Sequence, residues 1–338
     1  MKRVTIQDIA EELHLSRNTV AKALSDGSVS YETRVQVVKK AQQMGYAKLD
    51  EKLLQEVDNS LRQKNTGTIL VLFDRSDSSF WKQMLTGISD AVTMLGYRMQ
   101  LHIVEESDLD GDETLKVIAP DIQGIIFLCV FPIRFVKGMQ RAGLPMTFFN
   151  IPVNAEEYIA LGDVINVDGF YSLNRVTRYL IEKGKKEFAF IGYAQGSRVV
   201  QSRYIGFINA LQKYRIPINE KLFFTKPQRG NSFNYGLVAE IIESMENIPE
   251  VFICENDDIA EDVATALMKR NYDLAMKTTI VGFDNTISDD FFKPDIITVD
   301  IRKENLGKRL VKSILDRVED PAMDHAFITL STYPILPE

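Results

Sequence analysis

A short stretch near the N-terminus places several hydrogen-bonding side chains on one side of a predicted helix. Ser16 is a residue type that caps helices, and the helix expected after it extends to Leu24. The residues left facing outward are Arg17, Asn18, Thr19 and Lys22. In the major groove of DNA, arginine pairs bidentately with guanine and asparagine pairs with adenine. The pattern therefore predicts a helix whose outer face reads DNA.

Within this helix, Arg17 and Asn18 are the candidates for reading the DNA sequence, because the N-terminal residues of a groove-entering helix meet the base edges. Lys22 lies one turn further along and would reach a phosphate or a flanking base. Thr5, with Lys2 and Arg3, would hold backbone phosphates that position the helix without reading sequence. The residues expected to contact DNA in this region are Thr5, Ser16, Arg17, Asn18, Thr19 and Lys22.

Two further helices would position the groove-entering helix. Thr5 can cap a first helix that extends to Leu13 with apolar residues at helical spacing. Ser30 can cap a third helix that extends to Met44 and is ended by Gly45. Two short amphipathic helices alone could be ordinary helical packing. The third helix behind them favours a complete DNA-reading head over residues 1–46.

Length, charge and cysteine usage bound the rest of the molecule. The chain has 338 residues, so the head leaves a body large enough to bury its own core. A formal net charge of −7 excludes a generic polyanion binder, and attraction to DNA must come from local basic residues. Cys129 and Cys254 lie in apolar runs without paired or metal-ligating spacing, so we expect reduced, buried thiols and no metal or cofactor. No membrane-length apolar segment or leader is visible, which predicts a cytoplasmic protein.

From Gly67 onward, short β-rich runs alternate with helix-length segments, the pattern of parallel sheets with crossover helices. The predicted strands are 68–73, 97–104, 124–130, 146–150, 164–167, 188–192, 222–225, 251–255 and 279–283. The alternation restarts near Val164, which indicates two similar lobes. We expect the chain to cross between lobes near Asp163, at 292–298 and near Phe327. The lobes would then be about 67–163 with 298–326, and about 164–297 with 327–338.

Polar side chains follow several of these strands. Ligands in open α/β sheets bind beyond the carboxyl ends of the strands, so the cleft between the lobes should collect them. The candidates are Asp168, Arg203, Asn256 and Asp284. Arginine offers a planar fork of donors, carboxylates accept, and an amide does both, a mixture that suits a neutral polyhydroxylated molecule. A surface ion pair is the alternative for Arg203, helix capping is equally open for Asp168, and Asp257 is expected to be a cap.

Phe80 and Trp81 begin the helix expected after the first body strand. Either ring could stack on the apolar face of a sugar. An aromatic at a helix start is about equally often part of the core, and that alternative stays open.

The head resembles the LacI/GalR (lactose-repressor) family of bacterial regulators. The residues that carry the likeness are Val4 to Ala10, Leu15-Ser16, Thr19-Val20, Val29-Ser30, Glu32-Thr33-Arg34 and Gly45-Tyr46. The resemblance implies an all-α helix-turn-helix head joined to an α/β body, a two-lobed periplasmic-binding-protein-like (type I) effector domain. Ala21-Lys22 stands where the family usually has Ser-Arg, so the preferred DNA sequence is expected to be shifted.

The resemblance extends into the body. Arg203 with Gly206-Phe207 is similar to the family's Arg-x-x-Gly-Phe element, Asn256-Asp257 with Ala260 to Asn-Asp-x-x-Ala, and 281–284 to Val-Gly-Phe-Asp. Ser78-Ser79-Phe80-Trp81 keeps the aromatics of the family's Asn-Pro-Phe-Phe element but lacks Asn-Pro. These matches imply an effector site formed by Phe80, Trp81, Asp168, Arg203, Asn256 and Asp284.

The linker over residues 47–66 departs from the family, because the Pro-Asn and Ala-Arg-x-Leu hinge signature is absent. Leu61 is the best candidate for a wedge into the minor groove. Leu49, Leu53, Val57 and Leu61 recur four residues apart and would form one amphipathic helical face. We hypothesise a helix that pairs with its counterpart in a dimer; packing of that helix onto its own body is the alternative.

The whole pattern predicts a transcriptional regulator, a homodimeric repressor that binds double-stranded operator DNA under control of a sugar-like effector. One alternative is a solute-binding protein for transport, which would carry an export signal and no DNA head. Another is a sugar-metabolising α/β enzyme, which would need acid/base groups in the cleft. The three histidines, His14, His102 and His325, are far apart and accompany no recognisable nucleophile, so catalysis is not expected.

Overall fold

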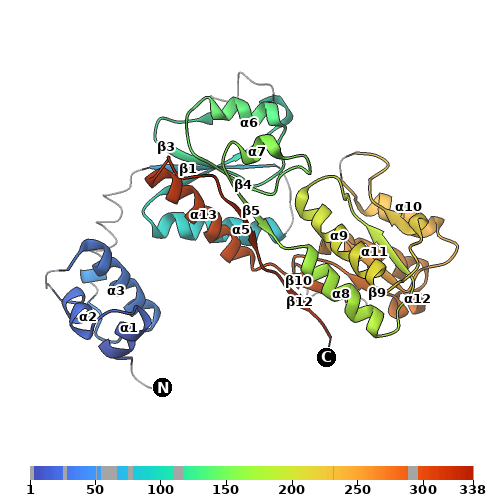
Figure 1. Ribbon diagram of the computed structural model, residues 1–338, viewed down its shortest axis with the longest axis horizontal. Coiled ribbons are helices and arrows are strands. Elements are labelled where there is room, and N and C mark those ends of the chain that lie inside the picture. The colour runs from blue at the N-terminus through green and yellow to red at the C-terminus, as the bar shows by residue number, and fades with distance from the viewer. Residues whose placement is uncertain are drawn as a thin grey trace. The chain divides into compact units, whose positions relative to one another are not determined.

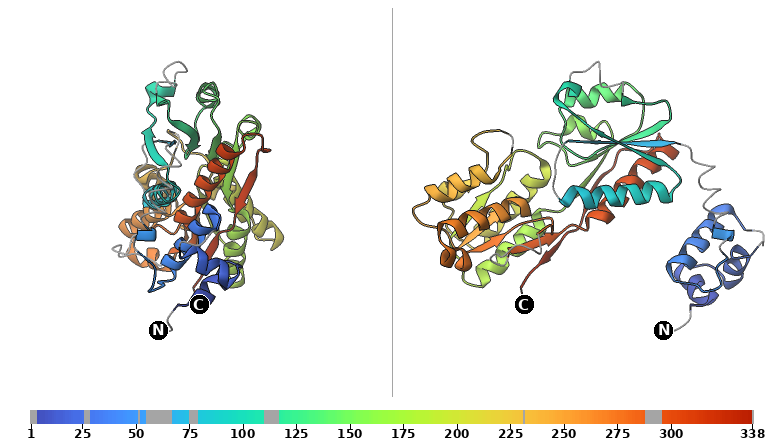
Figure 2. Two further views of the ribbon diagram at one scale, coloured as in Figure 1. Left: turned by 90° about the vertical axis from the view of Figure 1, so that its left-hand side faces the viewer. Right: turned by 180° about the vertical axis from the view of Figure 1, so that it is seen from behind.

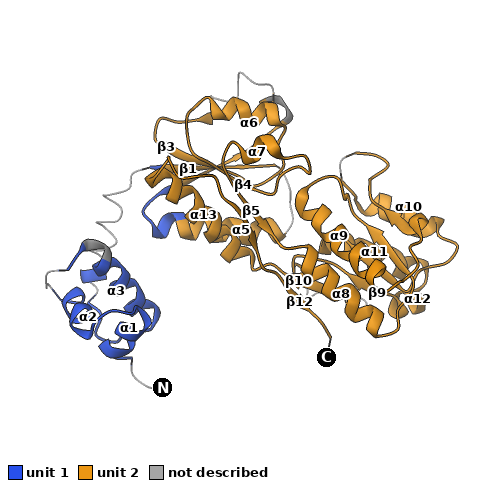
Figure 3. Cartoon of the chain, in the orientation of Figure 1, with its two compact units in different colours: residues 1–67, 92–98 blue, residues 68–91, 99–338 orange. Residues whose placement is uncertain are grey.

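The computed structural model describes residues 4–25, 29–50, 52–54, 67–74, 79–109, 117–230, 232–287 and 296–337. The chain separates into two compact units, Met1–Gly67 with Val92–Arg98 and Thr68–Ala91 with Met99–Glu338 (Figure 3). The first unit carries a group of three helices, and the second carries two α/β lobes (Figure 1). No helix in the described ranges combines the length and apolar character needed to cross a bilayer.

The three head helices are α1 (Ile6–Glu12), α2 (Arg17–Ala23) and α3 (Tyr31–Gln43). Each begins after a hydroxyl residue whose side chain accepts a backbone N–H of the first turn, which satisfies a donor that the helix itself cannot pair. Thr5 caps α1 in a reciprocal box with Asp8, Ser16 caps α2 and Ser30 caps α3. The helices predicted from these capping residues are confirmed.

The head has its own apolar core, whose fully buried residues are Ile9, Ala10, Val20, Ala23, Val37 and Ala41. Two turns fix how the helices meet. His14, between α1 and α2, has a φ of 53°, and Gly45, after α3, has a φ of 71°. Left-handed backbone is the usual conformation at a helix C-terminus, and glycine adopts it without strain.

The start of the linker belongs to the head. Leu53 is buried against Val38 of α3, and Leu49 and Leu54 pack beside them. The apolar face predicted for the linker therefore begins by covering α3, and neither the dimer-pairing nor the body-packing hypothesis included this contact. Val57 and Leu61, the remaining positions of that face, lie outside the described residues.

The first lobe contains a six-stranded sheet in the order β11-β5-β4-β3-β1-β2. Its strands are β1 (Thr68–Phe73), β2 (Arg98–Ile103), β3 (Ile122–Phe127), β4 (Met146–Phe149), β5 (Asp163–Val167) and β11 (Phe327–Leu330). Helices α5 (Ser79–Met94) and α13 (Lys303–Glu319) lie along one face, and α6 (Ile133–Gln140) and α7 (Glu156–Ile159) along the other (Figures 1 and 2). The pairs from β1 through β3, β4 and β5 to β11 are all parallel.

The second lobe contains a six-stranded sheet in the order β12-β10-β9-β8-β6-β7. Its strands are β6 (Phe188–Ile191), β7 (Phe223–Phe224), β8 (Val251–Cys254), β9 (Thr279–Val281), β10 (Ile296–Asp300) and β12 (Tyr333–Ile335). Its helices are α8 (Phe170–Glu182), α9 (Arg198–Lys213), α10 (Tyr235–Ser244), α11 (Asp257–Arg270) and α12 (Tyr272–Lys277). The β10–β12 pair is antiparallel, whereas the pairs that join β10, β9, β8, β6 and β7 are parallel.

Alternate residues of β6 serve the two faces of the second sheet. Ala189 and Ile191 belong to the core cluster beneath α10 and α11, and Phe190 stacks against Phe207 of α9. Such alternation is what a strand covered on both sides requires. Cys254 on β8 and Cys129 just after β3 are buried free thiols, as predicted.

Three segments connect the lobes: after β5, after β10, and between β11 and β12. The crossings predicted from the sequence, near Asp163, at 292–298 and near Phe327, lie before β5, β10 and β11. Each prediction was therefore wrong by one strand. Residues 292–295 lie outside the described residues. β11 pairs with β5 in the first sheet, and β10 pairs with β9 in the second. A local β pattern cannot specify which sheet a strand joins, because that choice is made by distant pairing partners.

Candidate DNA-reading surface and effector site

The outer face of α2 presents three exposed side chains: Arg17, Asn18 and Lys22. Val20 and Ala23 face inward and are fully buried, which fixes the orientation of the helix. Ser16 and Thr19 hydrogen-bond each other through their hydroxyls at 2.8 Å, and the Ser16 hydroxyl also accepts the Thr19 N–H at 3.0 Å. These two predicted DNA-contacting residues therefore hold the N-terminus of α2, and the residues beside them are free to face a groove.

A hollow of about 480 Å³ lies beside α2 in the head and is lined by Val4, Thr5, Ile6, Gln7, Arg17, Tyr46, Ala47 and Lys48. It brings the predicted pair Thr5 and Arg17 to one surface. Gln7 and Lys48 also line it, and the sequence analysis did not include them. Lys48 follows the Gly45 turn, and a basic residue just beyond a DNA-reading head was the signal that could have identified it. Leu61, the predicted minor-groove wedge, lies outside the described residues.

In the body, Arg203 of α9 and Asp284, which follows β9, form a buried ion pair. One guanidinium nitrogen of Arg203 donates to Asp284 Oδ1 at 3.1 Å, and the other donates to the backbone carbonyl of Glu255. The guanidinium carbon lies 3.7 Å from the centre of the Phe283 ring. The Arg203 Nε is buried and has no hydrogen-bond partner. A donor of this kind is costly to leave unpaired, so it suits an incoming acceptor.

Asp284 is held in place by its backbone. Its φ is 105°, and its N–H donates to the Val299 carbonyl at 2.9 Å. Lys303 donates to the carbonyls of Asp284 and Asn285. Burial raises the pKa of the Asp284 carboxyl to about 6, and the positive charges of Arg203 and Lys303 oppose that rise. This carboxyl is therefore an acceptor whose charge depends on pH near neutrality.

Glu255 directly follows β8 and lies beside Arg203, whose guanidinium donates to its carbonyl, although Glu255 was not among the predicted site residues. Its carboxylate accepts the Tyr193 N–H at 2.5 Å, and burial raises its pKa. Its position at the end of the predicted strand 251–255 was the available signal.

The roles expected for Asn256 and Asp257 are partly exchanged. Asn256 caps α11, with its side chain accepting the Ile259 N–H at 2.9 Å. Asp257 was predicted to be the cap, which was wrong: its carboxylate is 1% exposed and accepts the Thr286 N–H at 2.7 Å and the Thr298 hydroxyl at 2.8 Å. Burial and the charge of Asp284 raise the pKa of Asp257 to about 7.

The two predicted aromatics, Phe80 and Trp81, form one cluster in the first lobe. Their ring centres are 4.7 Å apart, Trp81 lies 5.1 Å from Phe73 at the end of β1, and Phe80 stacks at 6.2 Å on Phe149 at the end of β4. Both are partly exposed. The cluster marks the carboxyl edge of the first sheet, as expected.

The Asp168 carboxylate contacts the start of α8 and not Arg203 or Asp284. Its two carboxylate oxygens accept the Tyr171 and Ser172 N–H groups at 3.1 and 3.2 Å. Of the two options left open from the sequence, helix capping is the one that the contacts support. Among the described residues, no group of three or more His, Cys, Asp and Glu side chains could hold a metal ion.

The two lobes contact each other at the start of α9, the helix that carries Arg203. The Arg198 N–H at the start of α9 donates to the Ile151 carbonyl at 2.9 Å, and the next N–H donates to Asn150 Oδ1 at 3.5 Å. Asn150 follows β4 and has a φ of 63°. The carboxyl end of the first sheet is thus tied to the helix that carries Arg203.

Known proteins are similar to this chain over almost its whole length. Residues 177–336 match a family model described as a periplasmic binding protein-like domain. The HTH-type transcriptional repressor PurR of Vibrio parahaemolyticus serotype O3:K6 (strain RIMD 2210633) is 24% identical over 322 residues, covering 94% of this chain and 92% of that protein.

Two solved structures share the fold. One is a transcriptional regulator CelR–cellobiose complex, with a TM-score of 0.70 and 17% identity, covering 99% of each chain. The other is the lac repressor dimer bound to operator and the anti-inducer ONPF, with a TM-score of 0.62 and 19% identity, covering 99% of this chain and 98% of that one. With its capped helix-turn-helix head and two-lobed body, the chain has the fold of these regulators, and its sequence is similar to that of a named transcriptional repressor over 94% of its length.

Proposed function

We propose that this protein is a sequence-specific transcriptional repressor of the cytoplasm that acts as a homodimer on double-stranded operator DNA and is controlled by a small sugar-like effector. The observation that carries the proposal is the outer face of α2, where Arg17 and Asn18 are exposed at the N-terminal end of a helix fixed by its cap and its buried side. A head of this geometry, followed by a body of binding-protein type, favours a regulator over an enzyme.

The DNA-reading role rests on three features of the head. Arg17 and Asn18 occupy the part of the helix that meets base edges in helix-turn-helix proteins. Lys22 lies one turn further along and Lys48 lines the hollow beside Arg17, so both can reach phosphates. The relative of 24% identity is named a transcriptional repressor, and one structural neighbour is bound to operator DNA.

The effector role rests on the group around Arg203. The unpaired Arg203 Nε offers a donor, while the Asp284 carboxylate offers acceptor oxygens close by. The Asn256 side chain adds its NH2 donors, since its oxygen already caps α11, and Phe80 and Trp81 supply aromatic faces from the first lobe. One neighbour of the same fold contains cellobiose. A neutral molecule rich in hydroxyls fits this mixture, because each buried polar group then finds a partner.

Effector control requires that the ligand bind one arrangement of the two lobes better than another. Coupling to DNA is then of the order of 1–3 kcal/mol, as in most allosteric proteins. The Arg198 N–H donates to the Ile151 carbonyl and so joins the two lobes. A movement of one lobe toward the other would therefore displace the elements of both sheets next to this hydrogen bond.

The DNA half of the proposal is tested by selecting preferred duplexes from a random library with the full-length protein and repeating the selection with the Arg17→Ala variant. We expect wild type to enrich a two-fold symmetric sequence and the variant to lose preference at one or two base pairs in each half. Arg229→Ala, which changes an exposed arginine of the other unit, is the matched control and should enrich the wild-type sequence. Failure of wild type to prefer any duplex over random DNA would refute the proposal.

The effector half is tested by thermal shift of the full-length protein across sugars, polyols and sugar acids, since a ligand that binds only the folded state raises the melting temperature. We expect at least one sugar-like compound to raise it in wild type and to have no effect on the Asp284→Asn variant. A compound that shifts both proteins equally would place its site elsewhere. Absence of any shift would remove the sugar-like effector from the proposal.

A further inference from the structure

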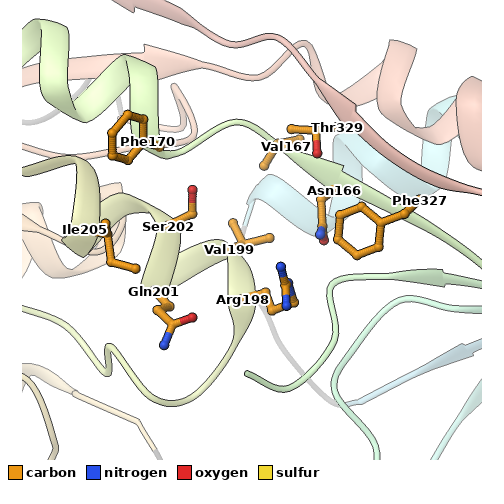
Figure 4. A pocket seen from close by; sticks show the side chains of 10 residues that line it. All are labelled: Asn166, Val167, Phe170, Arg198, Val199, Gln201, Ser202, Ile205, Phe327 and Thr329. Atoms are coloured by element: carbon orange, nitrogen blue, oxygen red, sulfur yellow. The ribbon is translucent and has the colours of Figure 1, made fainter. Parts of the chain in front are cut away.

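A second cavity, separate from the Arg203–Asp284 group, lies where the two lobes join. It has a volume of about 240 Å³. Its walls come from β5 and β11 of the first lobe and from the starts of α8 and α9 of the second (Figure 4). On α9 the lining residues include Arg198, Ser202 and Ile205, which recur at helical spacing on one side, whereas Arg203 is not part of the lining.

The cavity contains a buried polar atom that lacks a partner. Asn166 of β5 is 5% exposed, and its Oδ1 makes no hydrogen bond. The strand backbone around it is paired with β11 in register, so the strand cannot easily turn this side chain away. A buried amide oxygen without a donor costs free energy of the order of 1–3 kcal/mol. A ligand hydroxyl in the cavity would remove that cost.

The cavity is positively charged. Arg198 contributes its guanidinium, which lies 5.2 Å from the centre of the Phe327 ring, and none of the described lining residues is acidic. The N–H groups of the first turn of α9 already have acceptors in Ile151, Asn150 and Ser197, so Arg198 is the group that would meet an anion. A guanidinium binds a carboxylate through two parallel hydrogen bonds.

Arg198 and Asn166 lie at the end of the cavity opposite to Phe170 and Ile205, and Ser202 and Gln201 lie on the side of Ile205 (Figure 4). Phe327 lies with Asn166 and Arg198. A fitting ligand thus carries an anionic group and a hydroxyl close together, with an apolar group behind them. The volume is below the roughly 300–1,000 Å³ of pockets that hold drug-sized ligands, which limits the ligand to a small metabolite.

We propose that this cavity is a second ligand site, for small 2-hydroxycarboxylates with an apolar side group, in which Arg198 binds the carboxylate, the Asn166 side-chain oxygen accepts a hydrogen bond from the hydroxyl, and Phe170 and Ile205 contact the apolar group. Because the walls belong to both lobes, an occupant contacts the first lobe through Asn166 and the second through Arg198. Binding here therefore favours one arrangement of the lobes, and this consequence for DNA rests on the function proposed above.

The test uses the full-length protein and mandelate, which carries a carboxylate, an adjacent hydroxyl and a phenyl group. Isothermal titration calorimetry compares it with phenylacetate, which lacks the hydroxyl, and with 1-phenyl-1,2-ethanediol, which lacks the charge. We expect mandelate to bind about tenfold more tightly than either analogue, as the loss of one buried hydrogen bond predicts. Equal affinity for all three compounds, or no heat with mandelate at about 10 mM, would overturn the site.

Two arginine variants assign the binding to this cavity. Arg198→Gln removes the charge from an exposed side chain and should weaken mandelate binding about tenfold. Arg175→Gln removes an equal charge from an exposed position on α8 that does not line the cavity, and should leave the affinity unchanged. Equal weakening by both variants would mean attraction by net charge alone and would overturn the assignment.

A third variant separates this site from the proposed effector site. Asp284→Asn should bind mandelate as wild type does while losing the response to sugars. If mandelate binding is lost with Asp284→Asn but kept with Arg198→Gln, the compound occupies the Arg203–Asp284 site and the inference is wrong. Mandelate binding is measured without DNA, so it stands or fails independently of the repressor function.

Discussion

Arg203 and Asp284 are 81 residues apart in the chain, yet they form an ion pair of 3.1 Å in which the two side chains are only 7% and 12% exposed. The pair fastens α9 to the loop that follows β9, and Lys303 fixes the same loop from α13. Two buried opposite charges in contact are stable only together, because either one alone would have lost its water without gaining a partner. This relationship gives the first prediction.

Replacing Arg203 with leucine should lower the free energy of unfolding by about 3–5 kcal/mol, because it leaves the Asp284 carboxylate buried without its cation. The matched control is Arg229→Leu. Arg229 pairs with Glu240 at 3.1 Å, but the two side chains are 74% and 58% exposed, so the expected cost is about 0–1 kcal/mol. Urea denaturation followed by circular dichroism measures both. A similar loss of unfolding free energy in the two variants would show that burial does not make the Arg203–Asp284 pair more stabilising than the exposed pair.

The raised pKa of Asp257 predicts a pH dependence. Its ordinary pKa of 3.8 applies to the unfolded chain and a value of about 7 to the folded protein, so the folded state holds the proton more tightly. The free energy of unfolding therefore decreases through this group as the pH rises from about 4 to about 7, and its contribution does not change further above about 7. Asp257→Asn removes the titration. Across this window wild type should lose of the order of 3 kcal/mol relative to the variant. Parallel curves of unfolding free energy against pH would contradict the prediction.

The close crossing of α8 and α9 depends on Gly206. A Cβ built there would lie 2.2 Å from the Phe170 carbonyl oxygen, so Gly206→Ala must push the two helices apart. Overpacking of this kind costs about 1–3 kcal/mol. Gly236→Ala on α10 is the control, because its nearest neighbour would be 3.4 Å away. That variant should be neutral or gain up to about 1 kcal/mol from helix propensity. Thermal unfolding of both variants distinguishes a backbone clash from a general effect of added methyl groups.

The contact between Leu53 and Val38 predicts that the head and the beginning of the linker unfold together. Leu53 is 7% exposed and packs on Val38, so Leu53→Ala should destabilise the head by about 2–5 kcal/mol. Amide hydrogen exchange of the full-length protein should then be faster throughout α3 and unchanged in the second lobe. Lys52→Ala alters an exposed neighbour and should leave exchange in α3 as in wild type. Unchanged exchange in both variants would show that this contact does not stabilise the head.

The helices of the head could be predicted to within a residue or two because their ends are determined locally. Ser16 and Ser30 each accept an N–H only three residues away, an interaction that short sequence windows contain. Among the strands, β10, β11 and β12 were missed, and β5 and the segment that forms β11 were assigned to the wrong lobe. Their positions are decided by partners far along the chain, such as Ile328 opposite Ile165.

The same distinction holds in the effector group. The positions of Arg203 and Asp284 could be predicted from the rule that sites follow strand ends. The exchange between Asn256 and Asp257 could not, because both residue types cap helices and the choice depends on a neighbour from another strand. A Cβ at Gly282 would lie 2.1 Å from Asp257 Oδ1, so the glycine leaves the space in which that carboxylate is buried. Only the folded molecule brings these two positions together.

The placement of β11 and β12 in different sheets has a consequence for biosynthesis. Residues 327–335 supply an edge strand to the first lobe and the antiparallel strand to the second, and they emerge from the ribosome after the other strands of the described residues. The N-terminal helices can acquire their structure early during translation, since proteins fold domain by domain as they are made. Both sheets, by contrast, keep an unpaired edge until the last of these residues has been synthesised, and until then the nascent body is exposed to misassembly or to chaperones.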